Sequence, residues 1–285
     1  MVTAVFLIRP TAIRPSRPHG PRVTAPDAED TTMQALILGD GPFGRAVADA
    51  LAGHGLAVRV AGRPAVGAHE LGTFAGVDLV VDASRGDAVL ANVAAAVGAG
   101  VRRFAIATTA WEADRHDVDD LLRAQGAAAV AASNFSPGAL VFARLVEIAA
   151  RQAARLPGYE PYVVEWHRHG KADRPSGTAR DLARRILAAD PTLQRVSSPT
   201  DGPAEPGALE VVAVRAGTNP GRHLVGFDGP GETIELTLTA RDRGACASGV
   251  VAAADWLLAE PRPAGLHPFE AVLEVGEATE VRAAS

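Results

Sequence analysis

Lysine is almost absent from this chain, although basic residues are not. Of the 28 lysine and arginine residues among 285, only Lys171 is a lysine. Arginine stays protonated at any working pH, whereas a lysine amine can release and regain a proton. In a chain so biased towards arginine, a lysine is expected mainly where a side chain has to release a proton, which arginine cannot do. Lys171 is therefore a candidate proton donor.

Cysteine and long apolar runs are also scarce. The single cysteine, Cys246, excludes an intrachain disulfide framework and any metal site built from several cysteines. The apolar run at residues 4–8 is too short for a signal peptide or a membrane span. With a net charge of −5 and a pI near 5.9, we expect neither nucleic acid nor a membrane as partner. The scarcity of cysteine favours a reducing, cytoplasmic location.

Residues 1–32 differ in composition from the rest of the chain. The first 26 contain four arginines, five prolines and no acid, and a clear strand pattern then begins at Met33. An organellar targeting sequence would be unusually rich in proline. We interpret residues 1–32 as a disordered leader or as the product of a start codon assigned too early.

A glycine-rich turn follows the first expected strand, at residues 34–38. It has the pattern G-x-G-x-x-G, with a strand before it and a helical pattern after it. These glycines allow a tight turn and a close approach of the backbone to a pyrophosphate at the helix N-terminus. We expect the turn to bind a dinucleotide through Gly39, Gly41, Pro42, Phe43 and Gly44.

The identity of the cofactor depends on the end of the next expected strand, at residues 56–60. An acid there would bind the 2′-hydroxyl of NAD, but the chain continues with Ala61-Gly62-Arg63. Because Arg63 can pair with a 2′-phosphate, we predict NADPH, with NADH as the alternative cofactor. The structural alternative is that Arg63 is a solvent-facing loop residue.

Further strand–helix units extend to about residue 136. Strands are expected at 77–81, 103–107 and 127–132, and helices at 87–97 and 117–125, which predicts a doubly wound parallel sheet of the Rossmann type. Ligands of such sheets bind at the carboxyl ends of the strands. We expect the loops at 107–111 and 132–138 to approach the nicotinamide, although Thr108, Thr109 and Asn134 are also common turn formers. The candidate contacts are Ala107, Thr108, Thr109, Ser133, Asn134 and Phe135.

The pattern changes after a helix expected at 140–156. Strands at 162–167, 209–216, 223–227 and 233–239 and a helix at 178–189 predict a second, smaller α+β domain. A long polar loop is expected at 190–206. The final helix, at 247–258, is expected to pack back on the first domain.

The stretch from Glu165 to Thr178 combines several groups that can do chemistry. His167 and His169 lie within four residues of Lys171, and Pro175-Ser176-Gly177-Thr178 is typical of a helix start whose N–H groups can cradle an anion. A proton donor beside an anion cradle favours an enzyme acting on a carboxylate or a phosphate. The alternative is that these residues have only structural roles, as the end of a strand, a solvent-exposed basic turn and a helix N-cap.

Two other classes of function remain open. On an extended strand, Glu165, His167 and His169 would face one side and form an imidazole–carboxylate metal site. No cysteine cluster or H-E-x-x-H pattern accompanies them, and we expect no metal. The other alternative is a cofactor-binding sensor without turnover, against which the retained Lys171 argues.

From residue 33 to about 275, the chain resembles the 4-hydroxy-tetrahydrodipicolinate reductases of lysine and diaminopimelate biosynthesis. Glu165-x-His167 and Lys171-x-Asp173-x-Pro175-Ser176-Gly177-Thr178-Ala179 are similar to the family pattern E-x-H-H-x-x-K-x-D-x-P-S-G-T-A. Supporting matches are the glycine turn, Asp82-Ala83-Ser84-Arg85, Asn134-Phe135-Ser136, Arg215-x-Gly217, Gly221-x-His223 and Ala240-x-x-Arg243.

The resemblance implies an NAD(P)H-binding domain at 33–136, a substrate-binding and tetramerisation domain at 137–243, and a C-terminal helix and tail at 244–285 that return to the first domain. It implies a homotetramer that delivers hydride to a cyclic dicarboxylate imine, with His167 and Lys171 as the acid pair. The substrate contacts that it implies are Arg168, Ser176, Gly177, Thr178 and Arg243.

Four departures from the family pattern surround the implied site. Arg168 replaces a second histidine, Gly170 replaces a histidine or asparagine, and Leu238 replaces a histidine. The family turn G-T-T-G is Ala107-Thr108-Thr109-Ala110. These departures leave open a paralogue that reduces a related cyclic imine in secondary metabolism.

Overall fold

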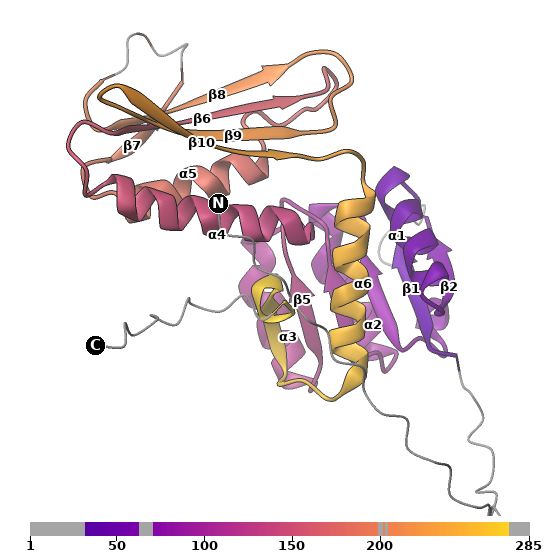
Figure 1. The fold of residues 1–285 in the computed structure, drawn as a ribbon. Coiled ribbons are helices and arrows are strands. Elements are labelled where there is room, and N and C mark those ends of the chain that lie inside the picture. The colour runs from indigo at the N-terminus through magenta and orange to yellow at the C-terminus, as the bar shows by residue number, and fades with distance from the viewer. Residues whose placement is uncertain (1–31, 63–70, 199–201, 203–204, 274–285) are drawn as a thin grey trace, which may run out of the picture. The chain divides into compact units, whose positions relative to one another are not determined.

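The computed structural model describes residues 32–62, 71–198, 202 and 205–273. The predicted leader, apart from Thr32, and the predicted phosphate ligand Arg63 lie outside the described residues. The described residues form one compact unit that contains two β-sheets (Figure 1). Among the described helices, none is both long and apolar enough to cross a bilayer.

The first sheet has six parallel strands in the order β11-β5-β4-β3-β1-β2. Its central strands are buried on both faces, as expected of a parallel sheet covered by helices. The predicted Rossmann-type fold is therefore confirmed. The strands are β1 (Gln34–Leu38), β2 (Ala57–Ala61), β3 (Leu79–Asp82), β4 (Arg103–Ile106), β5 (Ala128–Ala131) and β11 (Gly265–Pro268).

Helices cover both faces of this sheet (Figure 1). On one face, α1 (Pro42–Gly53) and α6 (Gly244–Ala259) pack together over a core that includes Val47, Leu51 and Val250. On the other face lie α2 (Val89–Gly98) and α3 (Arg115–Ala124). Gly249 lets α6 approach closely, because a Cβ there would stand 1.6 Å from the carbonyl oxygen of Phe135.

The second sheet is mixed, in the order β10-β9-β6-β8-β7. Helices α4 (Pro137–Ala153) and α5 (Gly177–Ala189) cover one face and share a core with it (Figure 1). The other face carries exposed apolar side chains, among them Trp166 and Val214. The strands are β6 (Glu160–His167), β7 (Arg195–Ser197), β8 (Ala208–Arg215), β9 (Arg222–Gly229) and β10 (Glu232–Thr239).

Two strands differ from the sequence-based expectations. The segment expected as a polar loop at 190–206 contains β7, which pairs parallel to β8 at the sheet edge. β11 follows the final helix and pairs parallel to β5. Both strands are only three or four residues long, and neither has an alternating apolar pattern. An existing sheet edge supplies the backbone hydrogen bonds that such short segments need.

The predicted domain boundaries at residues 33, 137 and 244 stay predictions. The final helix contributes Ala247, Val250, Ala253 and Leu257 to the core of the first sheet. The chain therefore leaves the first sheet through α4, builds the second sheet, and returns through α6.

Ala110, in the loop after β4, has a φ of 63° in the left-handed region. The loop is held tightly, since a Cβ on Gly86 would stand 1.9 Å from the Ala110 carbonyl oxygen. A side chain in this region costs about 1–2 kcal/mol, whereas glycine enters it freely. Replacing Ala110 by glycine should therefore raise the free energy of unfolding by up to about 1 kcal/mol, measured by urea denaturation.

Ala107→Gly provides the control in the same loop. The Ala107 amide donates to the carbonyl oxygen of Asp82 (2.8 Å) and continues the sheet ladder. There glycine should lower stability by about 0.5–1 kcal/mol. A loss of stability in both variants would mean that Ala110 is not strained.

Candidate active site

The glycine turn between β1 and α1 is built for close backbone approach. A Cβ on Gly39 would stand 2.4 Å from the Ala83 carbonyl oxygen, and one on Gly44 would stand 2.0 Å from the Gly39 carbonyl oxygen. Gly41, by contrast, has open space at its Cβ position. It is the N-cap of α1, with no side-chain cap and no acid in the first turn. The first N–H groups of α1 therefore fit the pyrophosphate of a dinucleotide.

Two predicted contacts of the turn have additional structural roles. Pro42 begins α1, where its missing N–H costs no hydrogen bond. The Phe43 ring is half-buried and packs against the core beneath α1 and α6. These two residues fix the start of the helix.

A carboxylate occupies the end of β2 in the structure, although it comes from another segment. A Cβ on Gly62 would stand 3.3 Å from Asp40 Oδ2, and the amide of Gly39 donates to the Ala61 carbonyl oxygen at 2.8 Å. The glycine turn therefore brings Asp40 to the position where dinucleotide-binding sheets commonly have an acid. The sequence-based prediction of NADPH rests only on Ala61-Gly62-Arg63 at the end of β2 and does not include this carboxylate.

Asp82 joins two loops at the carboxyl edge of the first sheet. Its buried Oδ1 accepts hydrogen bonds from the Ser84 amide (3.0 Å) and from the hydroxyls of Ser84 and Thr108 (both 2.6 Å). Its Oδ2 accepts from Asn92 Nδ2 at 2.9 Å. Thr108, a predicted nicotinamide contact, is therefore held in place by its hydrogen bond to Asp82. Of the neighbouring predicted contacts, Thr109 is exposed and Ala107 is half-buried. In the sequence, Asp82 was recognisable only as part of a motif, and this role was missed.

The loop after β5 connects the two sheets. Asn134 Oδ1 accepts from the Ser136 amide (2.9 Å), and its Nδ2 donates to Thr178 Oγ1 at the start of α5 (3.1 Å). The Phe135 ring is buried against Phe269, with ring centroids 5.0 Å apart. Phe135 can therefore offer a ligand only its backbone.

A cavity of about 600 Å³ lies where this loop meets α5. Its lining includes four of the predicted cofactor contacts together with one residue of the predicted anion cradle. The glycine turn, His167 and Lys171 are not among the lining residues. The predicted residues that the cavity brings together are Thr108, Thr109, Ser133, Asn134 and Thr178.

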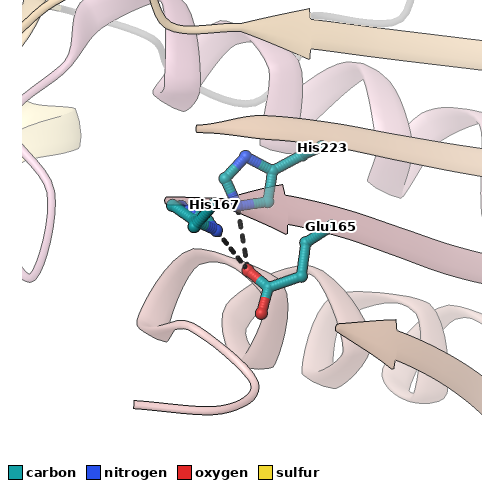
Figure 2. A group of neighbouring side chains, drawn as sticks. All are labelled: Glu165, His167 and His223. Atoms are coloured by element: carbon teal, nitrogen blue, oxygen red, sulfur yellow. Dashed lines mark ion pairs between the residues drawn. The ribbon is translucent and has the colours of Figure 1, made fainter. Parts of the chain in front are cut away.

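Strand β6 places Glu165 and His167 on its buried face. The Glu165 carboxylate is completely buried, and its Oε1 accepts hydrogen bonds from the Ser176 amide and from Arg215 Nη2, both at 2.8 Å. Its Oε2 lies 3.1 Å from His167 Nδ1 and 3.6 Å from His223 Nε2 (Figure 2). Residues from β6, β8, β9 and the start of α5 therefore converge on one carboxylate.

The surroundings of Glu165 keep it ionised. Burial opposes the charge, but contacts from the side chains of His167, His223, Ser176 and Arg215 outweigh burial and hold the pKa of Glu165 well below its ordinary value. A buried carboxylate that is ionised needs a partner of opposite charge, and Arg215 provides it. Arg215 and His223 were also recognisable in the sequence only as motif matches, although their strands flank β6.

The metal site considered from sequence does not form. β6 ends at His167, and His169 is exposed beyond it, with its Nδ1 3.4 Å from the Gly217 carbonyl oxygen. Among the described residues, His223 instead completes a group with Glu165 and His167 whose potential ligand atoms lie within 4.8 Å of one another. The guanidinium of Arg215 at the same carboxylate opposes a metal cation there. That no metal binds stays a prediction.

Lys171 lies in the loop between β6 and α5. Its Nζ forms an ion pair with Asp173 Oδ1 at 2.7 Å. Burial acts to raise the pKa of Asp173, but Lys171 and the Gly177 amide lower it overall. Arg215 also donates to the Asp173 carbonyl oxygen, so one side chain contacts both this loop and Glu165.

The predicted anion cradle is the N-terminus of α5. Ser176 is its buried N-cap, with Oγ accepting from the Ala179 amide (3.2 Å) and lying 3.3 Å from His223 Nε2. Gly177 and Thr178 follow and are half-buried, and no acid occupies the first turn of the helix. These features suit a carboxylate ligand.

The remaining predicted contacts and departures lie around this region. The side chains of Arg168 and Arg243 are exposed, and Arg243 is the N-cap of α6. The Cβ position of Gly170 is open, whereas Leu238 packs against the core of the second sheet. Of the residues Arg168, Gly170, Leu238 and Arg243, Leu238 is the one that packs against a core.

Sequence comparisons identify relatives over most of this region. Residues 138–273 match the family model described as dihydrodipicolinate reductase, C-terminus. The chain is 35% identical over 216 residues to a 4-hydroxy-tetrahydrodipicolinate reductase of Granulibacter bethesdensis, which covers 70% of this chain and 79% of that protein. A protein of the same name from Archaeoglobus fulgidus is 32% identical over 206 residues, covering 69% and 76%.

A solved structure supports the fold. A dipicolinate-bound dihydrodipicolinate reductase from Paenisporosarcina sp. TG-14 aligns with a TM-score of 0.61 at 19% identity, covering 83% of this chain and 97% of that one. The predicted family and the predicted class of enzyme are both confirmed. The chain belongs to the 4-hydroxy-tetrahydrodipicolinate reductase family of nicotinamide-dependent oxidoreductases.

Proposed function

We propose that this protein reduces 4-hydroxy-tetrahydrodipicolinate, a cyclic dicarboxylate imine, to tetrahydrodipicolinate in lysine and diaminopimelate biosynthesis. Family membership supports the reaction. The observation that carries the proposal is the 3.1 Å hydrogen bond from Asn134 to Thr178, which joins the carboxyl edge of the first sheet to the anion cradle. Hydride transfer requires substrate and nicotinamide to be in contact, and this junction lies between the region proposed for nicotinamide and the region proposed for the substrate carboxylate.

The residues of the chain divide the chemical tasks. Nicotinamide, when bound, supplies the hydride. The 4-hydroxy compound first loses water to give a conjugated imine. Hydride addition to this imine builds negative charge on the neighbouring carbon, which an acid must quench with a proton. Lys171 is the proton donor in this proposal, with His167 as its partner.

The substrate carboxylates require donors of their own. Ser176, Gly177 and Thr178 hold one carboxylate at the α5 N-terminus, where the Ser176 amide also donates to Glu165 and the Gly177 amide also contacts Asp173. Arg168 and Arg243, both exposed, contribute guanidinium groups that suit carboxylates. The cofactor contacts remain those proposed from sequence at the glycine turn and the loops after β4 and β5.

Replacing Lys171 tests the acid. Lys171→Ala should lower kcat by about 10²–10⁴-fold, the usual contribution of a general acid, and leave the Kd for NADPH within about twofold. Lys171→Arg is the matched variant, because it keeps the charge but cannot release a proton. The measurements are NADPH oxidation with freshly generated substrate and a fluorescence titration of NADPH.

Near-normal turnover by the arginine variant would refute Lys171 as the proton donor. Faster turnover of another cyclic imine than of 4-hydroxy-tetrahydrodipicolinate would favour the paralogue.

NADPH is the proposed cofactor, with NADH as a second one. The presence of Arg63 in the sequence favours NADPH, because an arginine can pair with the 2′-phosphate. The carboxylate of Asp40 beside Gly62 favours NADH, because it can accept hydrogen bonds from the ribose hydroxyls. Asp40→Ala should lower kcat/KM about tenfold with NADH but not with NADPH, because only NADH retains the 2′-hydroxyl that the acid accepts from. Asp49→Ala, an exposed change on α1, is the control. Equal changes with both cofactors would remove Asp40 from the ribose site.

We further propose that the protein is a cytoplasmic homotetramer that associates through the outer face of the second sheet. This face has a hollow of about 390 Å³ whose lining includes Tyr162, Val164, Trp166, Val214 and Leu224. Trp166 remains 40% exposed on a strand whose opposite face is core. A patch of large apolar side chains is typical of an interface.

Trp166→Glu tests this association. A carboxylate in a desolvated interface is strongly unfavourable, so the variant should dissociate to smaller species in multi-angle light scattering at micromolar concentration. Met33→Glu is the control, because Met33 is also 40% exposed but lies immediately before β1 of the first sheet. A tetramer that persists in Trp166→Glu, or a wild type that is monomeric, would refute the interface.

A further inference from the structure

The carboxylate of Glu165 lies between His167, two residues along the same strand, and the start of the anion cradle at Ser176. It is fully buried and cannot itself reach solvent. Its Oε1 accepts from the Ser176 amide at 2.8 Å, and its Oε2 lies 3.1 Å from His167 Nδ1 (Figure 2). The two oxygens of one side chain therefore face two different parts of the proposed site.

Arg215 extends this arrangement to the loop that carries Lys171. Its Nη2 donates to Glu165 Oε1 at 2.8 Å and also to the carbonyl oxygen of Asp173. The Asp173 carboxylate in turn pairs with Lys171 Nζ at 2.7 Å. A continuous series of contacts therefore runs from Glu165 to the proposed proton donor.

The contact between Glu165 and His167 is close but not aligned. Glu165 Oε2 and His167 Nδ1 are both buried, and neither has a partner with hydrogen-bond geometry although they are 3.1 Å apart. Hydrogen bonds of catalytic groups are often poorly aligned in the free protein and tighten when ligand binds. Because a carboxylate only accepts hydrogen bonds, alignment would place the ring proton on Nδ1 and leave Nε2 free for the site.

We propose that Glu165, paired with Arg215, is a positioning residue that sets the orientation of His167 and the placement of the anion cradle. This inference rests on the proposed function. In this proposal Glu165 does not touch the substrate and acts through His167 and the anion cradle, which do. His223 supports the same arrangement, since its Nε2 lies 3.3 Å from Ser176 Oγ and its ring packs edge-on against His167 at 5.2 Å.

Glu165→Gln is the test variant, because it keeps the shape of the side chain and removes its charge. Its matched control is Glu260→Gln, since Glu260 also pairs with an arginine, Arg262 at 2.6 Å, but lies at the surface with 65% of its side chain exposed. Glu165→Gln should lower kcat between about 10- and 100-fold, in line with the loss of other orienting groups. The Kd for NADPH should stay within about twofold, because the glycine turn is unchanged.

Two readouts separate positioning from a general structural role. The Kd for dipicolinate, a planar dicarboxylate probe, should rise about tenfold in Glu165→Gln at unchanged NADPH affinity. The ¹⁵N shifts of His167 in labelled protein should report the Nδ1–H tautomer with dipicolinate bound in wild type and a mixture of tautomers in the variant. Equal kinetics in Glu165→Gln and Glu260→Gln, or a parallel loss of NADPH affinity, would overturn the proposal.

Glu165→Asp covers the case in which the glutamine variant does not fold. It keeps the charge beside Arg215 but withdraws the carboxylate by one methylene. It should fold, bind NADPH normally and still lose kcat and dipicolinate affinity. Unchanged values in the aspartate variant would overturn the proposal, as would a stoichiometric metal ion in purified wild type that both variants lack.

Failure of the proposed function is distinguishable from failure of this inference. If wild-type protein binds NADPH but does not reduce 4-hydroxy-tetrahydrodipicolinate, the reaction is wrong. Dipicolinate affinity and the tautomer of His167 still decide whether Glu165 positions the site, because neither depends on turnover.

Discussion

The buried ion pair between Glu165 and Arg215 is the contact on which the second half of the molecule depends. It joins adjacent strands, β6 and β8, and reaches the loop and helix start that follow β6. Loss of one partner from such a pair costs about 3–5 kcal/mol, because it leaves an uncompensated charge in the interior. A surface pair such as Glu260 and Arg262 contributes about 0–1 kcal/mol. The difference comes from burial, since both are pairs of glutamate and arginine.

The first sheet uses a buried carboxylate in a comparable way. Asp82 at the end of β3 accepts from Ser84, Asn92 and Thr108, and thereby ties the loops after β3 and β4 together. Each donor left unpaired in the interior would cost about 1–3 kcal/mol. Both sheets therefore fix loops through an acid at or near the carboxyl end of a strand. The loops can then present backbone groups and small side chains to ligands at fixed positions.

Local patterns predicted most of the fold. The glycine turn was recognisable because three glycines in fixed spacing have a steric reason, which the close contacts at Gly39 and Gly44 now make explicit. The helices and the longer strands followed from periodic apolar positions. β7 and β11 were missed because three- or four-residue strands depend on an edge supplied by distant segments. No local pattern encodes that edge.

The sequence identified several side chains of the candidate site, but it did not predict which residues they contact. Lys171 and His167 stood out by residue type and spacing, and the helix start at Ser176 followed from capping chemistry. That His223, rather than His169, approaches Glu165 depends on the antiparallel register of β6 and β9, which pairs Glu165 with His223. Asp40 likewise reaches the end of β2 only because the turn folds back beside Gly62.

The departures from the family pattern can be separated by what they contact. Leu238 packs into the core beside α4, so its apolar character is compatible with a role in stability. Gly170 and Arg168 lie at exposed positions next to Lys171, where a change alters the surroundings of a ligand without disturbing the core. The ion pair of Glu165 and Arg215 is buried, whereas Arg168 and Gly170 are both exposed. On the proposed function, substrate preference therefore changes in the exposed layer while the buried pair holds His167 and the cradle in place.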